Sequence, residues 1–133
     1  MSKKIKMKTE KPLKMDQEHM QKLKNILLAP YMQIATNLIG KERHAGGNMF
    51  RHQLDTMTIL IDYGYIDSQL LKASVIHDVV EDIPGFDQDV IRSCDEEGEE
   101  VLNLVLEVTK REGEQKNQFL RRILETGSAK AKI

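Results

Sequence analysis

The chain has 133 residues, of which 40% are hydrophobic and 31% are charged, so its length and composition suit one folded domain with one core rather than a disordered protein. The formal net charge of −1 gives no reason to expect nucleic acid or an anionic membrane surface as a partner. Cys94 is the only cysteine, which excludes an internal disulfide and a multi-cysteine zinc site. Because no apolar run approaches the length that a bilayer requires, we expect a cytoplasmic protein without a membrane partner.

The N-terminal segment, residues 1–14, is rich in lysine and has no apolar period. This pattern predicts a flexible basic tail, and a basic arm that touches RNA is the alternative interpretation. Residues 15–133 then form the predicted domain. Their apolar residues recur at three- and four-residue spacing with turn residues between the segments, and no strand pattern interrupts them. We therefore expect an all-α fold.

The first predicted helix runs from Asp16 to about Ala29, and Pro30 either kinks it or opens a second helical piece that Gly40 ends. The polar, glycine-containing loop "KERHAGGNMF" follows. An amphipathic helix is then predicted from about Arg51 to Tyr63, ended by Gly64. The residues expected on its buried face are Leu54, Met57, Ile59, Leu60 and Ile61.

The next predicted helix is capped by Asp67 or Ser68 and runs without a break through "QLLKASVIHDVVED" to Pro84. Shorter helices are expected in "DQDVIRSC", "EEGEEVLNLVLEVTK" and "EQKNQFLRRILETG". Ser128 would then cap a final helix that has barely begun at Ile133.

Four ionisable residues lie in the apolar end of that long predicted helix: His77, Asp78, Glu81 and Asp82. On one continuous helix, His77 would lie over Glu81 and Asp78 over Asp82. Burying an unpaired carboxylate is costly, so the cluster needs a cation, hydrogen-bond partners or an open cleft. Two interpretations stay open at this point: a metal site, or a hydrogen-bonded core histidine beside capping or ion-paired acids.

A metal site would need a third ligand beside His77 and Asp78. Imidazole nitrogen and carboxylate oxygen suit borderline cations such as Mn²⁺, Fe²⁺, Co²⁺ or Zn²⁺. His52 is the candidate, because its helix precedes that of His77 and an antiparallel packing would bring the two imidazoles together. The alternative interpretation of His52 is a half-buried histidine that binds no metal.

The order of these residues, a histidine followed by a His-Asp pair, resembles that of the HD-domain metal phosphohydrolases. The longer string "HDVVED" is similar to the hydrolase domain of RelA/SpoT-type alarmone enzymes. The block "RHAGGNMFRHQ", the segment "LEVTK" and the C-terminal "SAKAKI" resemble further motifs of that family. The resemblance covers roughly residues 27–133 and implies an HD-type helical bundle.

The resemblance implies a 3′-pyrophosphohydrolase that uses Mn²⁺ or another divalent transition metal. Its substrates would be guanosine 3′,5′-bis(diphosphate) and the corresponding pentaphosphate, together written (p)ppGpp, from which it would release pyrophosphate. The residues that it assigns to the metal are His52, His77 and Asp78. Glu81 and Asp82 match the catalytic pair that handles the attacking water, and Arg43 would contact the guanine or a phosphate. Together with Lys41, His44 and Arg51, Arg43 forms a basic cluster suited to a polyanionic substrate.

The chain also departs from the family pattern. Gln53 replaces the proline that follows the first metal histidine, and Met49 stands where an aromatic residue is expected. The family's last metal ligand, an aspartate, would follow Ile133, so we expect the domain to be cut short at its C-terminus. Two other functions remain open: an HD phosphohydrolase for another nucleotide, and a non-catalytic regulatory HD protein if the natural chain ends at Ile133.

Overall fold

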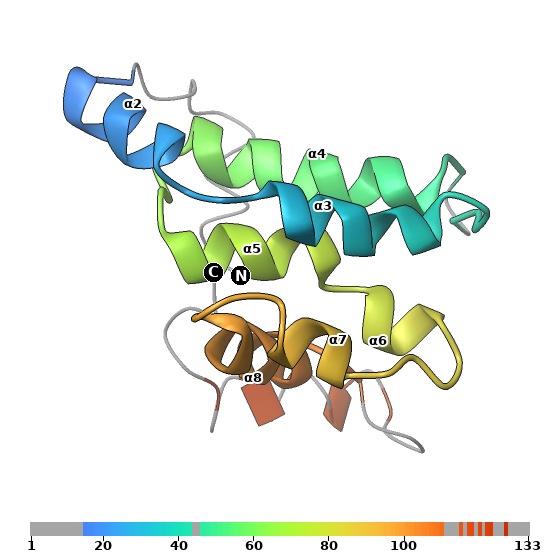
Figure 1. The fold of residues 1–133 in the computed structure, drawn as a ribbon. Coiled ribbons are helices and arrows are strands. Elements are labelled where there is room, and N and C mark those ends of the chain that lie inside the picture. Colours follow the sequence, from blue (N-terminus) through green and yellow to red (C-terminus); the bar gives the residue numbers. More distant parts are fainter. Residues whose placement is uncertain are drawn as a thin grey trace.

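The computed structural model describes residues 15–43 and 46–110 and, beyond them, positions 115, 117, 118, 120, 122, 123 and 127. In these residues helices are joined by turns and loops, with a single isolated bridge between Glu42 and Asn48 and no strand, which confirms the all-α fold (Figure 1). None of the described helices has the length and apolar character needed to cross a membrane. The predicted tail at residues 1–14 and the predicted cap at Ser128 lie outside the described part of the chain.

The first described helix, α2 (Gln17–Lys24), begins where the sequence predicts, because the Asp16 side chain accepts a hydrogen bond from the His19 backbone N–H. It ends at Lys24, so the predicted extension to Ala29 was wrong. Pro30 lies instead in the first turn of a separate helix, α3 (Ala29–Ala35), the position where proline's missing N–H costs nothing.

A short 3₁₀ helix, η1 (Thr36–Leu38), continues from α3, and the chain turns at Gly40 as predicted. The next helix, α4 (Met49–Asp62), starts two residues earlier than predicted, because Asn48 caps it by accepting from the Phe50 N–H. Gly64 follows it with a φ of 84°, a conformation that favours glycine at a helix end. The predicted burial of Ile59 was wrong, because this residue is 48% exposed.

The long helix predicted from Asp67 to Pro84 is two helices in the structure. Asp67 caps α5 (Ser68–Ile76) by accepting from the Leu70 N–H, and α6 (Val79–Asp82) follows after a break. The prediction of one continuous helix was therefore wrong at His77 and Asp78.

The break coincides with a hydrogen bond from the neighbouring helix α4. In a continuous helix the Asp78 N–H would donate to the Ser74 carbonyl, four residues earlier. Nδ1 of His77 lies 2.7 Å from that carbonyl instead, and the Asp78 N–H donates to the Gln53 side chain at 3.1 Å. Side chains thus replace the backbone hydrogen bond that would have carried the helix forward.

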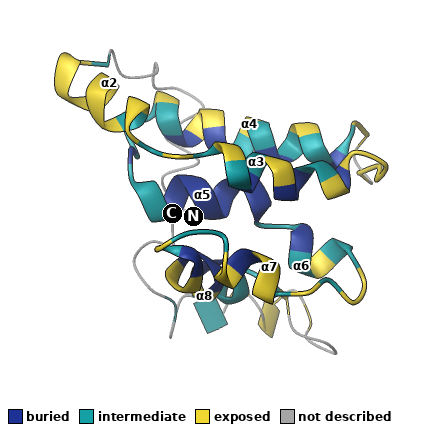
Figure 2. Cartoon of the chain, viewed as in Figure 1, coloured by how far each residue is buried: buried dark blue, intermediate teal, exposed yellow. Residues whose placement is uncertain are grey.

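Helix α5 is the centre of the fold. It packs against α3 and α4 on one side and against α8 (Gly98–Glu107) on the other, and α7 (Asp89–Arg92) packs on α8 (Figure 1). Every residue of α5 from Leu70 to Ile76 is buried, whereas α2 is exposed at the edge of the molecule (Figure 2). The C-terminal end of this buried helix carries the His-Asp pair, so the pair is anchored by the core.

Candidate metal centre

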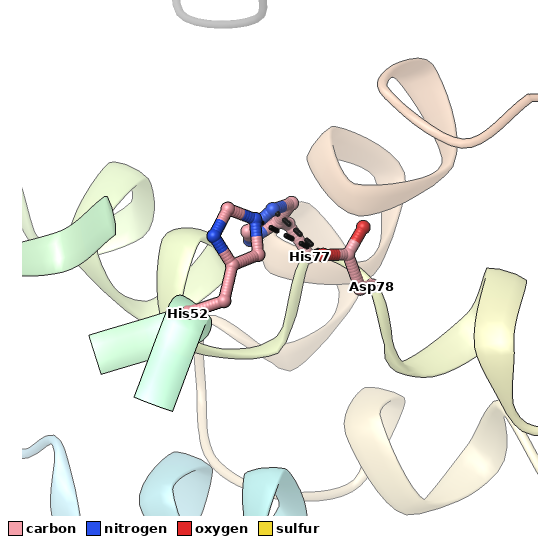
Figure 3. Close-up of side chains that lie close together, drawn as sticks. All are labelled: His52, His77 and Asp78. Carbon is pink, nitrogen blue, oxygen red and sulfur yellow. Dashed lines mark ion pairs between the residues drawn. The ribbon is translucent and has the colours of Figure 1, made fainter. Parts of the chain in front are cut away.

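Three side chains predicted as metal ligands come together where α4 meets the junction between α5 and α6. His52 projects from the first turn of α4, and His77 and Asp78 occupy the junction (Figure 3). One ligand atom from each lies within 4.8 Å of the others, and the two imidazole rings are 5.3 Å apart between centroids. The predicted approach of His52 to His77 is confirmed.

The Asp78 carboxylate is close to both imidazoles. Its Oδ2 atom is 3.1 Å from Nε2 of His77 and 3.5 Å from Nε2 of His52. All three side chains are partly buried, between 19% and 27% exposed, so they are sheltered from water yet reachable from outside. Three donor atoms thus converge on one small volume.

The imidazole of His77 is oriented by the backbone of its own helix. Its Nδ1 atom lies 2.7 Å from the Ser74 carbonyl oxygen, which can only accept, so Nδ1 carries a proton. Nε2 is then the atom that faces Asp78 and can bind a metal. A metal-binding histidine is commonly held in this way by a carbonyl on its other nitrogen.

The Asp78 carboxylate is held by Gln53, which stands where the HD resemblance leads us to expect a proline. Gln53 is fully buried, and its Nε2 donates to Asp78 Oδ2 at 2.8 Å. A signal for it does exist in the sequence: a polar residue stands four positions before Met57, on the buried face of α4. Helical periodicity places it in the core, but does not name its partner.

The three residues differ in how the fold moves their pKa values. Burial, helped by the nearby His77, lowers the pKa of His52 below 6.5. Burial also works against charge on His77 and Asp78, but their mutual hydrogen bond and attraction outweigh it, so the His77 pKa is raised and the Asp78 pKa lies below 3.8. Near neutral pH, His52 is therefore neutral and Asp78 is ionised, the states in which each ligates a metal.

A cleft of about 430 Å³ opens beside these residues. It brings together most of the predicted site: besides two of the three ligands, the lining includes both predicted catalytic acids and two of the predicted basic residues. The lining residues are Lys41, Glu42, Arg43, Met49, His52, Asp78, Glu81 and Asp82. Four carboxylates thus face two cationic side chains, which leaves the cleft negatively charged.

The basic side of the cleft is built by a tight loop before α4. The Met49 N–H donates to the Lys41 carbonyl and the Arg43 N–H to the Gly47 carbonyl, each at 2.9 Å. Gly46 and Gly47 have φ values of 90° and 87°, which side-chain-bearing residues rarely adopt. The loop therefore depends on its glycines to present Lys41 and Arg43 to the cleft.

Two other members of the predicted basic cluster have different outcomes. Arg51 does not line the cleft, because its side chain is 81% exposed and lies 3.9 Å from Asp55, one helical turn away on α4. Its inclusion in the cluster was wrong. His44 lies outside the described residues. Glu42, by contrast, lines the cleft although no motif had indicated it.

Glu81 and Asp82 lie on α6 and line the cleft, although the helix break means that the stacking expected from one continuous helix does not apply. Burial, together with the charges of Asp78 and Asp82, raises the Glu81 pKa above 4.5. A carboxylate with a raised pKa is a better proton acceptor, which suits the predicted role of Glu81 in handling the attacking water.

The donor set fits a divalent transition metal. Two imidazole nitrogens and one carboxylate oxygen suit borderline cations, and three protein ligands leave coordination positions for water or substrate.

Comparisons with known proteins find no family model that matches the chain and no curated protein similar to it.

Proposed function

We propose that this chain is an HD-type, metal-dependent phosphohydrolase that releases pyrophosphate from the 3′ position of guanosine 3′,5′-bis(diphosphate) and its pentaphosphate, in the cytoplasm. The observation that carries the proposal is the convergence of His52, His77 and Asp78 beside a cleft lined by further acids and by basic residues. The choice of substrate depends on the resemblance of "HDVVED" to the alarmone hydrolases.

The metal would be held by Nε2 of His52, Nε2 of His77 and the Asp78 carboxylate. A bound divalent cation, Mn²⁺ by the resemblance, lowers the pKa of its water and offsets phosphate charge. The charge of the cleft supports a bound cation. Without one, its four carboxylates outnumber its two cationic side chains and would repel a polyanionic substrate.

The chain's own residues have distinct roles in the proposed reaction. Lys41 and Arg43 bind phosphate oxygens or the base through charge-assisted hydrogen bonds. A carboxylate of α6, Glu81 or Asp82, accepts a proton from the attacking water as its oxygen bonds to phosphorus. The bond from phosphorus to the ribose 3′ oxygen breaks, pyrophosphate is released, and the 3′ oxygen takes up a proton to become a hydroxyl.

The test compares three variants in the presence of Mn²⁺: Glu81→Gln, Asp82→Asn and, as a matched control, Asp55→Asn. Asp55 is an exposed acid of α4 outside the cleft. The two α6 variants should lose roughly 10²- to 10⁴-fold in pyrophosphate release, the typical contribution of a general base, and keep their Mn²⁺ affinity. The control should keep both. Normal turnover by both α6 variants would contradict the proposal.

A second candidate is an HD phosphohydrolase for another nucleotide. The observation that favours it is Met49, which lines the cleft where the family resemblance leads us to expect an aromatic residue for stacking on the base. Turnover should be compared among the guanosine tetraphosphate, deoxynucleoside triphosphates and nucleoside monophosphates. Faster hydrolysis of either alternative would assign the second function, and nucleotide binding without any turnover would indicate a regulatory protein.

A further inference from the structure

The Gln53 side chain joins α4 to the break between α5 and α6, and both hydrogen bonds that the structure gives it go to Asp78. We propose that Gln53 is a positioning residue that aims the Asp78 carboxylate at the two imidazoles and thereby sets the metal affinity of this site. The inference rests on the proposed metal-dependent function and adds to it a residue that the HD resemblance does not supply.

The first support is the geometry of the pair. Nε2 of Gln53 donates to Asp78 Oδ2 at 2.8 Å, and Oε1 of Gln53 accepts from the Asp78 backbone N–H at 3.1 Å. Only this orientation of the amide matches donors with acceptors at both ends. Gln53 therefore restrains both the backbone and the carboxylate of Asp78, and its own fully buried polar atoms are satisfied by doing so.

The second support is the direction of the Asp78 carboxylate. Asp78 precedes α6 in a helical backbone conformation (φ −96°, ψ −3°), not the extended one from which an aspartate caps a helix, and its side chain makes no cap hydrogen bond. The carboxylate contacts Gln53 and His77 instead, so its partners lie outside α6.

The third support is the helix break itself. Without the Gln53 oxygen, the Asp78 N–H has the Ser74 carbonyl as its competing partner, and that bond would continue α5 through the His-Asp pair. A continuous helix is also what periodicity alone predicts for this segment. Gln53 therefore favours the broken conformation in which Asp78 Oδ2 lies 3.1 Å from Nε2 of His77.

The chemistry of an amide suits this role. A carboxylate oxygen can accept more than one hydrogen bond, so the bond from Gln53 still leaves Oδ2 able to bind a metal. The donating NH₂ group carries no lone pair that would compete for the cation. Outer partners of this kind typically contribute roughly 10- to 100-fold to metal affinity.

The experiment uses the 133-residue chain and Co²⁺, whose visible absorption reports the ligand geometry. Gln53→Met keeps an unbranched side chain of similar size but removes both contacts to Asp78. Met57→Ala is the control, because Met57 is buried one turn further along α4 and its loss perturbs packing without removing a polar contact. Gln53→Met should bind Co²⁺ roughly 10- to 100-fold more weakly with altered visible bands, and Met57→Ala should match the wild type in both.

A measurement on the wild type covers the case in which Gln53→Met does not fold. In the Co²⁺-bound protein, the Gln53 side-chain NH₂ protons should exchange with solvent much more slowly than those of Gln33, which is exposed on α3. Equal exchange at the two residues would overturn the inference.

The outcomes separate this inference from the proposed function. Equal Co²⁺ affinity and spectra in the wild type and Gln53→Met would overturn the role of Gln53 and leave the metal site standing. Failure of the wild type to bind Co²⁺ would overturn both.

Discussion

Helix α5 contributes to two clusters of charged groups, one around Lys72 in its middle and one just past its end at His77 and Asp78, and the two differ in how their charges are compensated. In the first, Nζ of Lys72 lies 2.9 Å from Asp95 and 2.7 Å from Glu97, and Tyr31 donates to Asp95 at 2.6 Å. In the second, the Asp78 carboxylate lies close to two imidazoles at the edge of an open cleft.

The pKa shifts express the same difference. Burial opposes charge on Lys72 and Asp95, yet their hydrogen bonds prevail, so the Lys72 pKa is raised above 10.5 and the Asp95 pKa lies below 3.8. Hydrogen bonds, first that from Lys72, lower the Glu97 pKa as well. The shifts in the Lys72 cluster thus all favour its charged forms, whereas in the candidate metal centre the pKa of His52 is lowered and that of His77 is raised. The first cluster is joined by short ion pairs that stabilise the fold, whereas the second borders a cleft where a ligand can bind.

The largest expected effect is a loss of stability when the Lys72 cluster is broken. Lys72→Met leaves two carboxylates without their cation, and removing one partner of a buried ion pair typically costs 3–5 kcal/mol; because Asp95 and Glu97 are partly exposed, we expect about 2–4 kcal/mol. Urea unfolding measures this loss in the free energy of unfolding. Co²⁺ affinity, measured on the folded protein, should stay at the wild-type value, and a loss below about 1 kcal/mol would show that the cluster is not stabilising.

Asp78→Asn should weaken metal binding and leave stability nearly unchanged, the reverse of Lys72→Met. It removes a charged ligand, so Mn²⁺ and Co²⁺ affinity should fall by more than about 100-fold, beyond the loss expected for an outer partner. Stability should change by only about 1 kcal/mol, because asparagine keeps an oxygen that can accept from Gln53. Metal titration and urea unfolding of the same sample test both, and wild-type metal affinity would rule Asp78 out as a ligand.

Arg43→Ala should affect substrate without affecting metal. Arg43 lines the cleft from the glycine-containing loop and supplies no metal ligand. Loss of one charge-assisted contact should weaken substrate binding by roughly 1.5–3 kcal/mol, seen as a higher KM. Arg51→Ala is the matched control and should leave KM unchanged, because Arg51 points to solvent. An unchanged KM with lost metal in Arg43→Ala would contradict this role.

The smallest effect is a pH dependence of stability in the metal-free protein. Because the His77 pKa is raised above 6.5, its contribution to stability is fully present below 6.5 and is lost as the pH rises through the raised value. The stability of the wild type relative to His77→Gln should therefore decline across that window. The cost of Lys72→Met should stay constant over the same pH range, and a parallel decline in both would show that the two clusters do not differ in this way.

Much of the fold follows from local signals in the sequence. The caps at Asp16 and Asp67 and the stop at Gly64 are correct because each depends on residues within one helical turn. The grouping of His52 with His77 was also predictable, because the buried face of the amphipathic α4 must pack on the apolar segment that ends at His77. The sequence by itself therefore determined the all-α class and indicated which three side chains group at the candidate site.

Tertiary contacts decided the rest. The break before Asp78 depends on Gln53, which is 25 positions away, and helical periodicity contains no information about a hydrogen bond between distant residues. The direction of Arg51 was likewise set by its position on the outer face of α4, and Lys72 is a buried cation only because Asp95 and Glu97 return to it from the α7–α8 connection. Local sequence specifies which residues form helices, whereas the partners of buried polar groups are specified only when the helices pack.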